Sequence, residues 1–135
     1  MNILFICRHN RFRSKVAEAI FNKLNKNKSI KAESAGIIKD IPASKNVRKV
    51  LKEKRMKLKS IISRRFNEGI IRRTDIIVIV ADNVSKGIFK KFGKKIIVWK
   101  ISDVSQSDVK GIRKRAEIIE KKVRSLLMLL GHKKV

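Results

Sequence analysis

Short apolar runs that alternate with helical patterns constrain the fold of this chain most strongly. Four runs have the length of strands, and the later ones are rich in β-branched residues. They cover residues 2–7, 30–34, 76–81 and 95–100. Strands that alternate with helices indicate a parallel sheet with right-handed crossovers and helices on its faces. The sequence therefore predicts an α/β three-layer sandwich with a four-stranded parallel sheet.

Apolar residues at helical spacing mark the segments between and after these runs. Val16, Ala17, Ile20, Phe21 and Leu24 predict a helix that starts at Ser14, with the Ser14 hydroxyl as its cap. A second helix is expected over 44–53, another between the two later strands, and a long one over 107–130 that Gly131 ends. The region 57–65 is expected to be irregular, and both later strands are expected to be central.

Composition limits the size and the partners of the protein. The 135 residues, 43% of them hydrophobic, are enough for one core, so a single domain is expected over 1–135. The net charge of +25 draws the chain toward phosphate-bearing partners. Because Lys and Arg are scattered and there is no Tyr or zinc-ligand spacing, nucleic acid is a conceivable partner but not the favoured one.

Cysteine usage and hydropathy bear on the compartment. A single cysteine excludes an internal disulfide, and the apolar start, ILFI, is too short for a signal peptide because Cys7 and Arg8 end it. No apolar run approaches the ~20 residues that a membrane span needs. We therefore expect a cytoplasmic protein without a membrane partner, and nothing in the sequence indicates an oligomeric state.

The segment C-R-H-N-R-F-R-S, residues 7–14, is the candidate site and is called the nucleophile loop below. Cys7 ends the first predicted strand, where ligands of parallel sheets bind, and the loop opens a helix whose N–H groups and dipole stabilise an anion. This environment favours a thiolate, so Cys7 is the predicted nucleophile. Arg13 can grip two phosphoryl oxygens, and Ser14 can donate to the sulfur.

Several features of the loop support this interpretation together. A lone cysteine is more often a core residue, and because 36 of 135 residues are basic, about one in four would have a basic residue six positions later by chance. Three features strengthen the interpretation of Cys7 as a nucleophile. They are its placement at the strand end, the Ser directly after the Arg, and an Asn in the loop that tolerates left-handed backbone. The predicted substrate-binding residues are Arg8, His9, Asn10, Arg11, Phe12 and Ser14.

Further motifs follow in order along the chain. They are the loop itself, KVAEAIF in the next helix, Glu33-Ser-Ala-Gly36, Ser63-Arg64 before a helix, and Ile101-Ser102-Asp103. In these motifs the chain resembles the low-molecular-weight protein tyrosine phosphatases, which are related in fold to thioredoxin-coupled arsenate reductases. The resemblance implies hydrolysis of phosphomonoesters, phosphotyrosine in proteins above all, through a phosphocysteine on Cys7. It implies Asp103 as general acid and needs no metal or cofactor.

The chain departs from the family pattern at the mouth of the site. Val104 follows Asp103 where the family usually has proline, and the aromatic residues expected nearby are missing. Arg8, His9 and Arg11 make the loop more cationic, which favours an acidic or multiply phosphorylated substrate. Ile61 replaces a histidine that supports the loop asparagine, so the loop is expected to be held differently. His9 is expected either to support the site from behind or to face solvent, and the second is favoured.

Alternatives remain open at this point. Asp108 competes with Asp103 as general acid, although it can also cap the last helix. A non-catalytic module that binds anions or nucleic acid would explain the charge of +25. Arsenate reduction is disfavoured because Phe12 stands where the family has a second loop cysteine, and Arg13 disfavours a phosphoryl carrier of the sugar-transport type.

Overall fold

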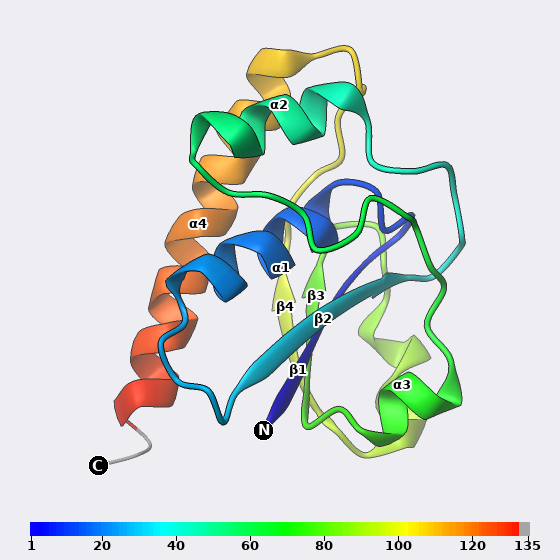
Figure 1. The fold of residues 1–135 in the computed structure, drawn as a ribbon. Coiled ribbons are helices and arrows are strands. Elements are labelled where there is room, and N and C mark those ends of the chain that lie inside the picture. The colour runs from blue at the N-terminus through cyan, green and yellow to red at the C-terminus, as the bar shows by residue number, and fades with distance from the viewer. Residues whose placement is uncertain (133–135) are drawn as a thin grey trace.

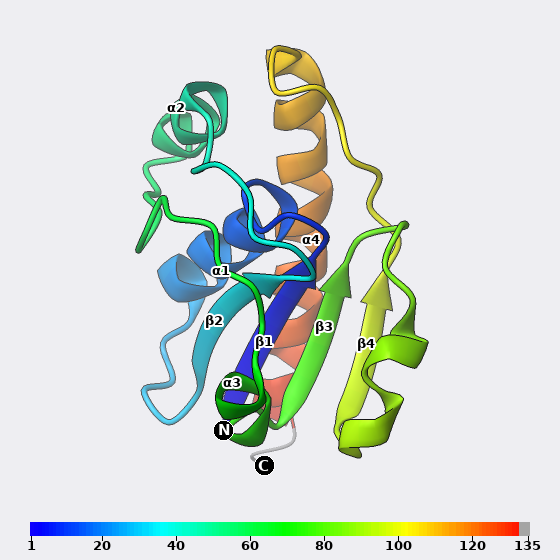
Figure 2. The same ribbon diagram turned by 90° about the vertical axis from the view of Figure 1, so that its right-hand side faces the viewer.

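A four-stranded parallel sheet forms the centre of the computed structural model, which describes residues 1–132 (Figures 1 and 2). The strands are β1 (Asn2–Cys7), β2 (Lys31–Gly36), β3 (Ile76–Val80) and β4 (Lys95–Trp99), in the order β2-β1-β3-β4. Cys7 pairs in register with Gly36, and Ile6 with Ile79. The predicted α/β class and the parallel sheet are confirmed.

Helices cover both faces of this sheet. The helices α1 (Arg13–Leu24) and α4 (Val109–His132) pack on one face, and α2 (Lys45–Glu53) lies against the start of α4 (Figure 1). The helix α3 (Glu68–Arg72) and two 3-10 turns, η1 (Lys86–Ile88) and η2 (Lys90–Phe92), cover the other face (Figure 2). The residues at alternate positions of β1 and β3 enter two separate cores, one on each face.

The helix caps agree with the sequence at α4, differ from it at α1, and include one at Ser44 that was not predicted. Ser44 caps α2, since its Oγ accepts a hydrogen bond from the N–H of Val47 at 3.2 Å. Asp108 caps α4 by accepting from the N–H of Gly111 at 2.9 Å. The prediction that Ser14 caps α1 is wrong, because α1 begins at Arg13 and the Ser14 hydroxyl is bonded to Cys7.

Three other predictions are corrected by the structure. β4 is an edge strand, not a central one, since it pairs only with β3. The segment between them forms two 3-10 turns instead of an α-helix, because it turns sharply at Gly93, whose φ of 68° is left-handed. Gly131 does not end α4, which continues to His132, since glycine inside a helix costs only about 1 kcal/mol.

The parallel strands bring their carboxyl ends to one edge of the sheet, at the top of Figure 1. Cys7 ends β1 there, Asp82 follows β3, and the segment 100–108 leaves β4 toward α4. This edge therefore gathers the candidate residues. None of the helices in residues 1–132 is long and apolar enough to span a bilayer.

Candidate active site

The nucleophile loop wraps its backbone and side chains around the sulfur of Cys7. Cys7 Sγ lies 3.0 Å from Ser14 Oγ and accepts from the N–H of Asn10 at 3.3 Å. Asn10 has a φ of 51°, the left-handed conformation expected for it, which lets the chain turn back over the strand end. The loop thus directs two hydrogen-bond donors at the thiol.

The Asn10 side chain fixes the direction of the hydrogen bonds around Cys7. Its Nδ2 donates to Ser14 Oγ at 2.8 Å and to Ser34 Oγ at 3.1 Å, while its Oδ1 accepts from the N–H of Arg64 at 3.0 Å. An amide nitrogen only donates, so Ser14 uses its oxygen to accept and keeps its proton for the sulfur. The Ser34 hydroxyl donates in turn to Glu18 Oε1.

A second segment, residues 59–65, supports the loop from outside. Ser63 Oγ donates to the carbonyl of His9 at 2.6 Å and accepts from the N–H of Asp40 at 2.9 Å. The carbonyl of Arg64 accepts from the N–H of Gly36. With Ile61 in place of a histidine, main-chain groups and the Ser63 hydroxyl hold the loop in this chain.

Gly36, at the end of β2, lies against the turn of the loop. A Cβ on this residue would lie 2.9 Å from the Asn10 nitrogen and 3.0 Å from the Arg8 carbonyl oxygen. Both are backbone atoms that cannot yield without moving the loop. The close approach of strand and loop therefore requires glycine at this position.

The Arg13 guanidinium is buried, with 1% exposure, and held at the carboxyl edge of the sheet. Its Nη1 donates to the Ile101 carbonyl at 2.8 Å, and its Nη2 donates to Asn83 Oδ1 at 3.1 Å. These two bonds use two of the five N–H donors of a guanidinium. The other three N–H donors of the guanidinium make no hydrogen bond within residues 1–132.

Two carboxylates flank Arg13, each at 3.7 Å. Asp82 Oδ1 lies this far from Nη1, and Asp103 Oδ2 lies this far from Nη2; the side chains are 47% and 36% exposed. The Asp103 carboxylate also accepts from the N–H of Val104. Asp103 is thus close to Arg13 while one side of its carboxylate meets solvent. Asp108 is engaged as the cap of α4.

The other loop residues predicted to bind substrate lie in different environments. Arg8 is exposed, and Phe12 is buried in the core, so only the Phe12 backbone can reach a ligand. His9 does not simply face solvent, because its Nδ1 lies 2.9 Å from Asp40 Oδ2. Arg11 lies 3.9 Å from the same carboxylate, and its Nε has no hydrogen-bond partner in the described residues.

No aromatic side chain in the described part of the chain is exposed at the mouth. The chain has no Tyr, and most of its aromatic rings are buried in the two cores. Phe92, which is partly buried, lies in η2 and packs against Phe89. The structure therefore agrees with the sequence in giving this site no aromatic rim.

Several residues of the site were not identified from the sequence. Asp82 and Asn83 approach Arg13, while Ser34 and Glu18 complete the network around Asn10. The sequence position of Asp82 could have identified it as a site residue, since it directly follows a buried strand at the edge where ligands bind. The contacts of the others depend on how separate elements pack.

Glu33 ties β2 to the supporting segment. It accepts two hydrogen bonds from Arg73 and one from Arg64. These bonds, those of Arg73 first, hold the pKa of Glu33 well below its ordinary 4.5, at about 2, although partial burial acts in the opposite direction. Glu33 is therefore a structural carboxylate with no proton to exchange near neutral pH.

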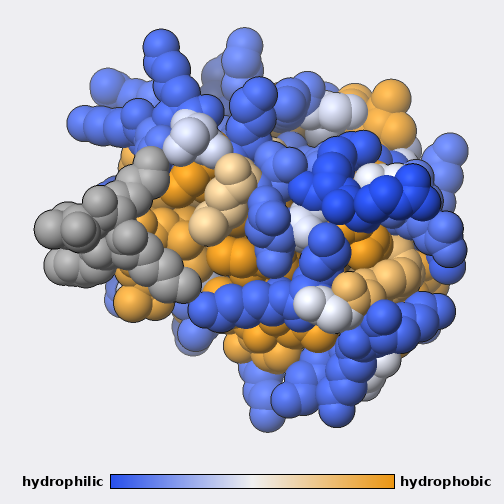
Figure 3. Space-filling model, turned by 90° about the horizontal axis from the view of Figure 1, so that it is seen from below, coloured by the Kyte–Doolittle hydropathy of each residue, from blue (hydrophilic) through white to orange (hydrophobic). Residues whose placement is uncertain are grey.

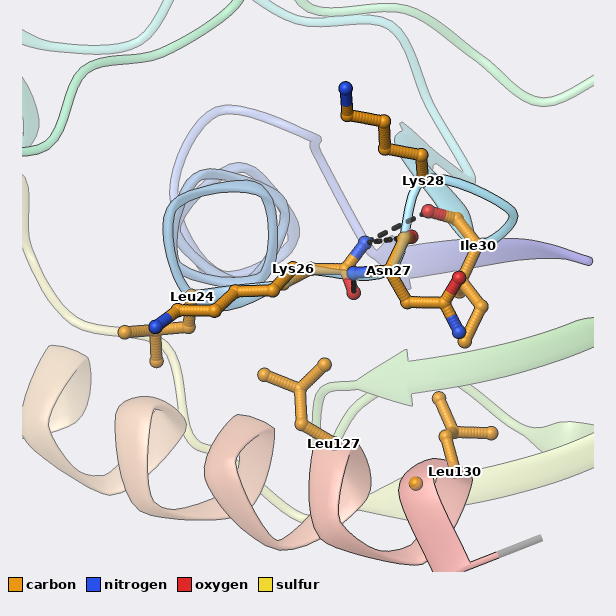
Figure 4. A pocket seen from close by; sticks show the side chains of 9 residues that line it. Leu24, Lys26, Asn27, Lys28, Ile30, Leu127 and Leu130 are labelled. Carbon is orange, nitrogen blue, oxygen red and sulfur yellow. Dashed lines mark hydrogen bonds between the residues drawn. The ribbon is translucent and has the colours of Figure 1, made fainter. Parts of the chain in front are cut away.

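A cavity of about 560 Å³ lies at the opposite end of the sheet, between the α1–β2 turn and the end of α4 (Figure 4). Leucines and an isoleucine line it together with lysines and asparagines of the turn. The view from below shows apolar surface here between hydrophilic side chains (Figure 3). It does not adjoin the nucleophile loop, so it is separate from the candidate active site.

Comparisons with known proteins agree with this geometry. The sequence model of the low molecular weight phosphotyrosine protein phosphatases matches residues 2–135. A comparison with curated proteins found no match. Among solved structures, the YwlE arginine phosphatase from Geobacillus stearothermophilus is similar, at 20% identity over 98% of this chain and 94% of that one, with a TM-score of 0.87.

Two further similar structures carry other descriptions than arginine phosphatase. A low molecular weight protein tyrosine phosphatase from T. tengcongensis is 24% identical over 95% of this chain and 98% of that one, with a TM-score of 0.84. An arsenate reductase from Archaeoglobus fulgidus is 29% identical over 93% and 98%, with a TM-score of 0.74. With the family match over almost its whole length, this chain belongs to the low molecular weight phosphotyrosine protein phosphatase family.

Proposed function

We propose that this chain hydrolyses phosphorylated substrates through a phosphocysteine on Cys7. The observation that carries the proposal is the arrangement of Cys7 and Arg13. The sulfur receives donors from Asn10 and Ser14, and the guanidinium is held in place with donors to spare. A loop that carries both a cysteine nucleophile and an arginine held in place by its own hydrogen bonds is suited to in-line phosphoryl transfer.

The reaction has two steps. In the first, the Cys7 thiolate attacks phosphorus, the S–P bond forms, and the bond to the leaving group breaks. Arg13 and the loop amides stabilise the charge on the equatorial oxygens, and Asp103 gives its proton to the leaving atom. In the second, Asp103 takes a proton from water, which attacks phosphorus and releases the thiolate. The Ser14 hydroxyl stabilises the sulfur as it leaves.

Asp103 is proposed as the acid because of its place beside Arg13. Its carboxylate lies 3.7 Å from the guanidinium that would hold the phosphoryl group. Asp108 instead bonds to the N–H of Gly111, which uses it as a helix cap. A carboxylate next to the clamp is within reach of a leaving group, whereas one engaged at a helix start is not.

The substrate class has two candidates. Phosphotyrosine in proteins follows from the resemblance to the family. Phosphoarginine is favoured by a specific observation: the mouth has no aromatic rim for a tyrosine ring but has two carboxylates, Asp82 and Asp103, which can pair with a guanidino group. The neighbouring YwlE structures are described as arginine phosphatases.

Arsenate reduction by a chain of cysteines is not proposed. That chemistry passes oxidation from the first thiol to further thiols, and Cys7 is the only cysteine in the sequence. A phosphatase uses the thiol without oxidising it, so one cysteine is sufficient.

The test is turnover of an aryl phosphate, a phosphotyrosine peptide and a phosphoarginine peptide by the full chain. We expect hydrolysis that is lost in Cys7→Ser, and we expect Asp82→Asn to lower the rate on phosphoarginine more than the rate on phosphotyrosine. Activity that survives Cys7→Ser would sink the proposal. No hydrolysis, with nucleic-acid affinity that falls steeply with salt, would favour the non-catalytic binding module.

A further inference from the structure

A groove on the outer side of α1 gathers positive charge that the protein does not neutralise. Two adjoining cavities, of about 490 and 390 Å³, share Ala19, Asn22 and Lys57 as lining residues. They lie between α1, the end of α2, the start of β2 and the segment 55–59, which passes across α1 after α2 (Figure 1). Together these two cavities are called the basic groove below.

Lys and Arg are enriched in the basic groove, and their side chains are unpaired. They make up half of its lining residues but only 36 of the 135 residues in the chain, and no carboxylate lines either cavity. Lys54, in the same part of the chain, points elsewhere and bonds to Glu120 of α4 at 2.9 Å. Six exposed cations of the groove have no hydrogen bond or ion pair of their side chains within residues 1–132, namely Lys23, Lys31, Lys52, Arg55, Lys57 and Lys59.

The floor of the basic groove is apolar. Ala19 of α1 and Ala32 of β2 are buried, with exposures of 5% and 7%, and Ile30 is buried beside them. Met56 and Leu58 are partly buried and pack against the same core. A ligand in the groove would therefore meet an apolar surface below and cations along the rim.

This combination fits a segment of another protein. Side chains of an extended segment alternate in direction, so apolar ones can reach the floor while acidic ones stay at the rim beside the cations. Asn22 lies where the two cavities meet, and its amide makes no hydrogen bond within the described residues. An amide both donates and accepts, as pairing with a peptide backbone requires.

Other occupants fit the basic groove less well. Single-stranded nucleic acid is bound by stacking bases on aromatic side chains, and no aromatic residue lines either cavity. A flat bilayer surface would touch the rim but not the recessed floor. A second copy of this chain, also with a charge of +25, would be repelled.

We propose that the basic groove binds an acidic segment of a partner protein, in which apolar side chains alternate with Asp or Glu. The rim cations attract the segment and the apolar floor selects it among other polyanions. None of the lining residues belongs to the nucleophile loop, so binding in the groove and turnover at Cys7 can be measured separately.

The test is fluorescence anisotropy of a short fluorescein-labelled peptide, in which glutamates alternate with leucine and valine, titrated with the full chain. A second peptide has serine in place of the leucines and valines, and an oligothymidylate of equal charge represents nucleic acid. The groove variant combines Lys23→Gln, Lys57→Gln and Lys59→Gln, which removes three cations spread along the rim.

A matched variant controls for the charge of the chain as a whole. It combines Lys86→Gln, Lys90→Gln and Lys95→Gln, which removes three exposed lysines of η1, η2 and β4 that are also unpaired within residues 1–132. β4 is the edge of the sheet opposite β2. Because both variants lose the same charge, a difference between them reports where the peptide binds.

We expect the groove variant to bind the glutamate–leucine–valine peptide about 10- to 30-fold more weakly than wild type, and the matched variant to bind it within about threefold of wild type. The serine peptide should bind wild type about tenfold more weakly than the first peptide. The oligothymidylate should bind more weakly than the first peptide and lose affinity equally in both variants. Thermal unfolding checks that each variant is folded.

Four outcomes would overturn the inference. No binding of the first peptide by wild type would remove the site, and equal losses in both variants would assign binding to the overall charge. Equal affinity for the two peptides would mean that the apolar floor is not used. Tighter binding of the oligothymidylate than of the peptide, lost only in the groove variant, would make the groove a nucleic-acid site instead.

Discussion

The nucleophile loop and the segment that carries Asp103, residues 100–108, meet at Arg13 but are built in opposite ways. Cys7, Asn10, Arg13 and Ser14 are all buried, and neighbouring elements bond to the loop from two sides. Asp103 is exposed, in a segment without regular structure. The core thus fixes the groups proposed to bind the phosphoryl group, and surface contacts place the carboxylate proposed to transfer protons.

Surface contacts at two points hold the segment 100–108. Arg115 of α4 donates to the carbonyl and the hydroxyl of Ser102, at 2.9 and 3.0 Å. Asn46 of α2 donates to the carbonyl of Gln106 at 2.8 Å. Such bonds are individually worth about 1 kcal/mol. Substitutions in the loop should therefore abolish turnover, while substitutions that loosen the segment should only reduce it.

The largest effect is expected from Arg13→Lys. Lysine keeps the charge but has neither the planar fork nor the bonds to Ile101 and Asn83, so kcat should fall by roughly 10²–10³. Steady-state kinetics with an aryl phosphate measure this. Arg124→Lys, a surface change on α4, is the control. A fall of less than tenfold would mean that positive charge alone is sufficient.

The next effect is expected from Asp103→Asn, and it should depend on the leaving group. Without its acid the enzyme should lose about 10²-fold in kcat on an alkyl or phenyl phosphate but much less on a nitrophenyl phosphate, whose leaving group needs no proton. Asp108→Ala should keep the wild-type rate and lose about 1 kcal/mol of stability as a helix cap. The reverse pattern would make Asp108 the acid.

A smaller effect is expected from Gly36→Ala. The added methyl group would meet the backbone of Asn10 and Arg8, so the loop must shift and kcat/KM should fall about tenfold, with about 1–3 kcal/mol lost in stability. Gly131→Ala is the matched control, because none of residues 1–132 lies within 4 Å of its added Cβ. Urea denaturation and kinetics on both variants separate the two effects. Wild-type kinetics in Gly36→Ala would show that the loop tolerates displacement.

A few-fold loss of kcat is expected from Arg115→Ala. This substitution removes the two hydrogen bonds to Ser102 and makes the segment 100–108 more mobile, while the contacts of Cys7 and Arg13 are unchanged. The loss should be about two- to tenfold, confined to substrates that need the acid. Comparing kcat on phenyl phosphate with kcat on nitrophenyl phosphate tests whether the loss is confined to the substrate that needs the acid. Equal losses on both substrates would mean that Arg115 acts on the nucleophile loop instead.

The smallest effect concerns pH and Glu33. Its folded-state pKa of about 2 lies below the ordinary 4.5, so its contribution to stability is complete above pH 4.5 and is lost as pH falls from there toward 2. Its arginine partners are partly exposed, which keeps the effect small. Urea denaturation should show Glu33→Gln less stable than wild type at neutral pH and the difference shrinking in acid. A difference that stays constant through this window would exclude the linkage.

The sequence was sufficient to predict the strands and the position of Cys7 but not the side-chain contacts of the site. The apolar runs predict the strands and the position of Cys7 because burial on both faces of a sheet leaves a clear pattern. Of the two roles predicted for the Ser14 hydroxyl, the helix cap is wrong, while the hydroxyl does lie 3.0 Å from the sulfur of Cys7. The central placement of β4 failed because an edge strand that packs on a helix is also apolar.

The contacts of Arg13 with Asn83 and Ile101 were beyond prediction for another reason. They join residues about 70 and 88 positions apart, and only the packing of the strand ends decides which side chains meet. Local patterns therefore predict elements, and long-range contacts define the site.

The most direct test of the proposed reaction is to trap its phosphocysteine intermediate. The Asp103→Asn variant should be mixed with a nitrophenyl phosphate, quenched in acid and analysed by mass spectrometry, because the first step proceeds with this leaving group while the second lacks its base. We expect one added phosphoryl group, located on the Cys7 peptide and missing in the double variant with Cys7→Ser. Steady turnover with no phosphoryl group on Cys7 at any time, or a phosphoryl group on another residue, would contradict it.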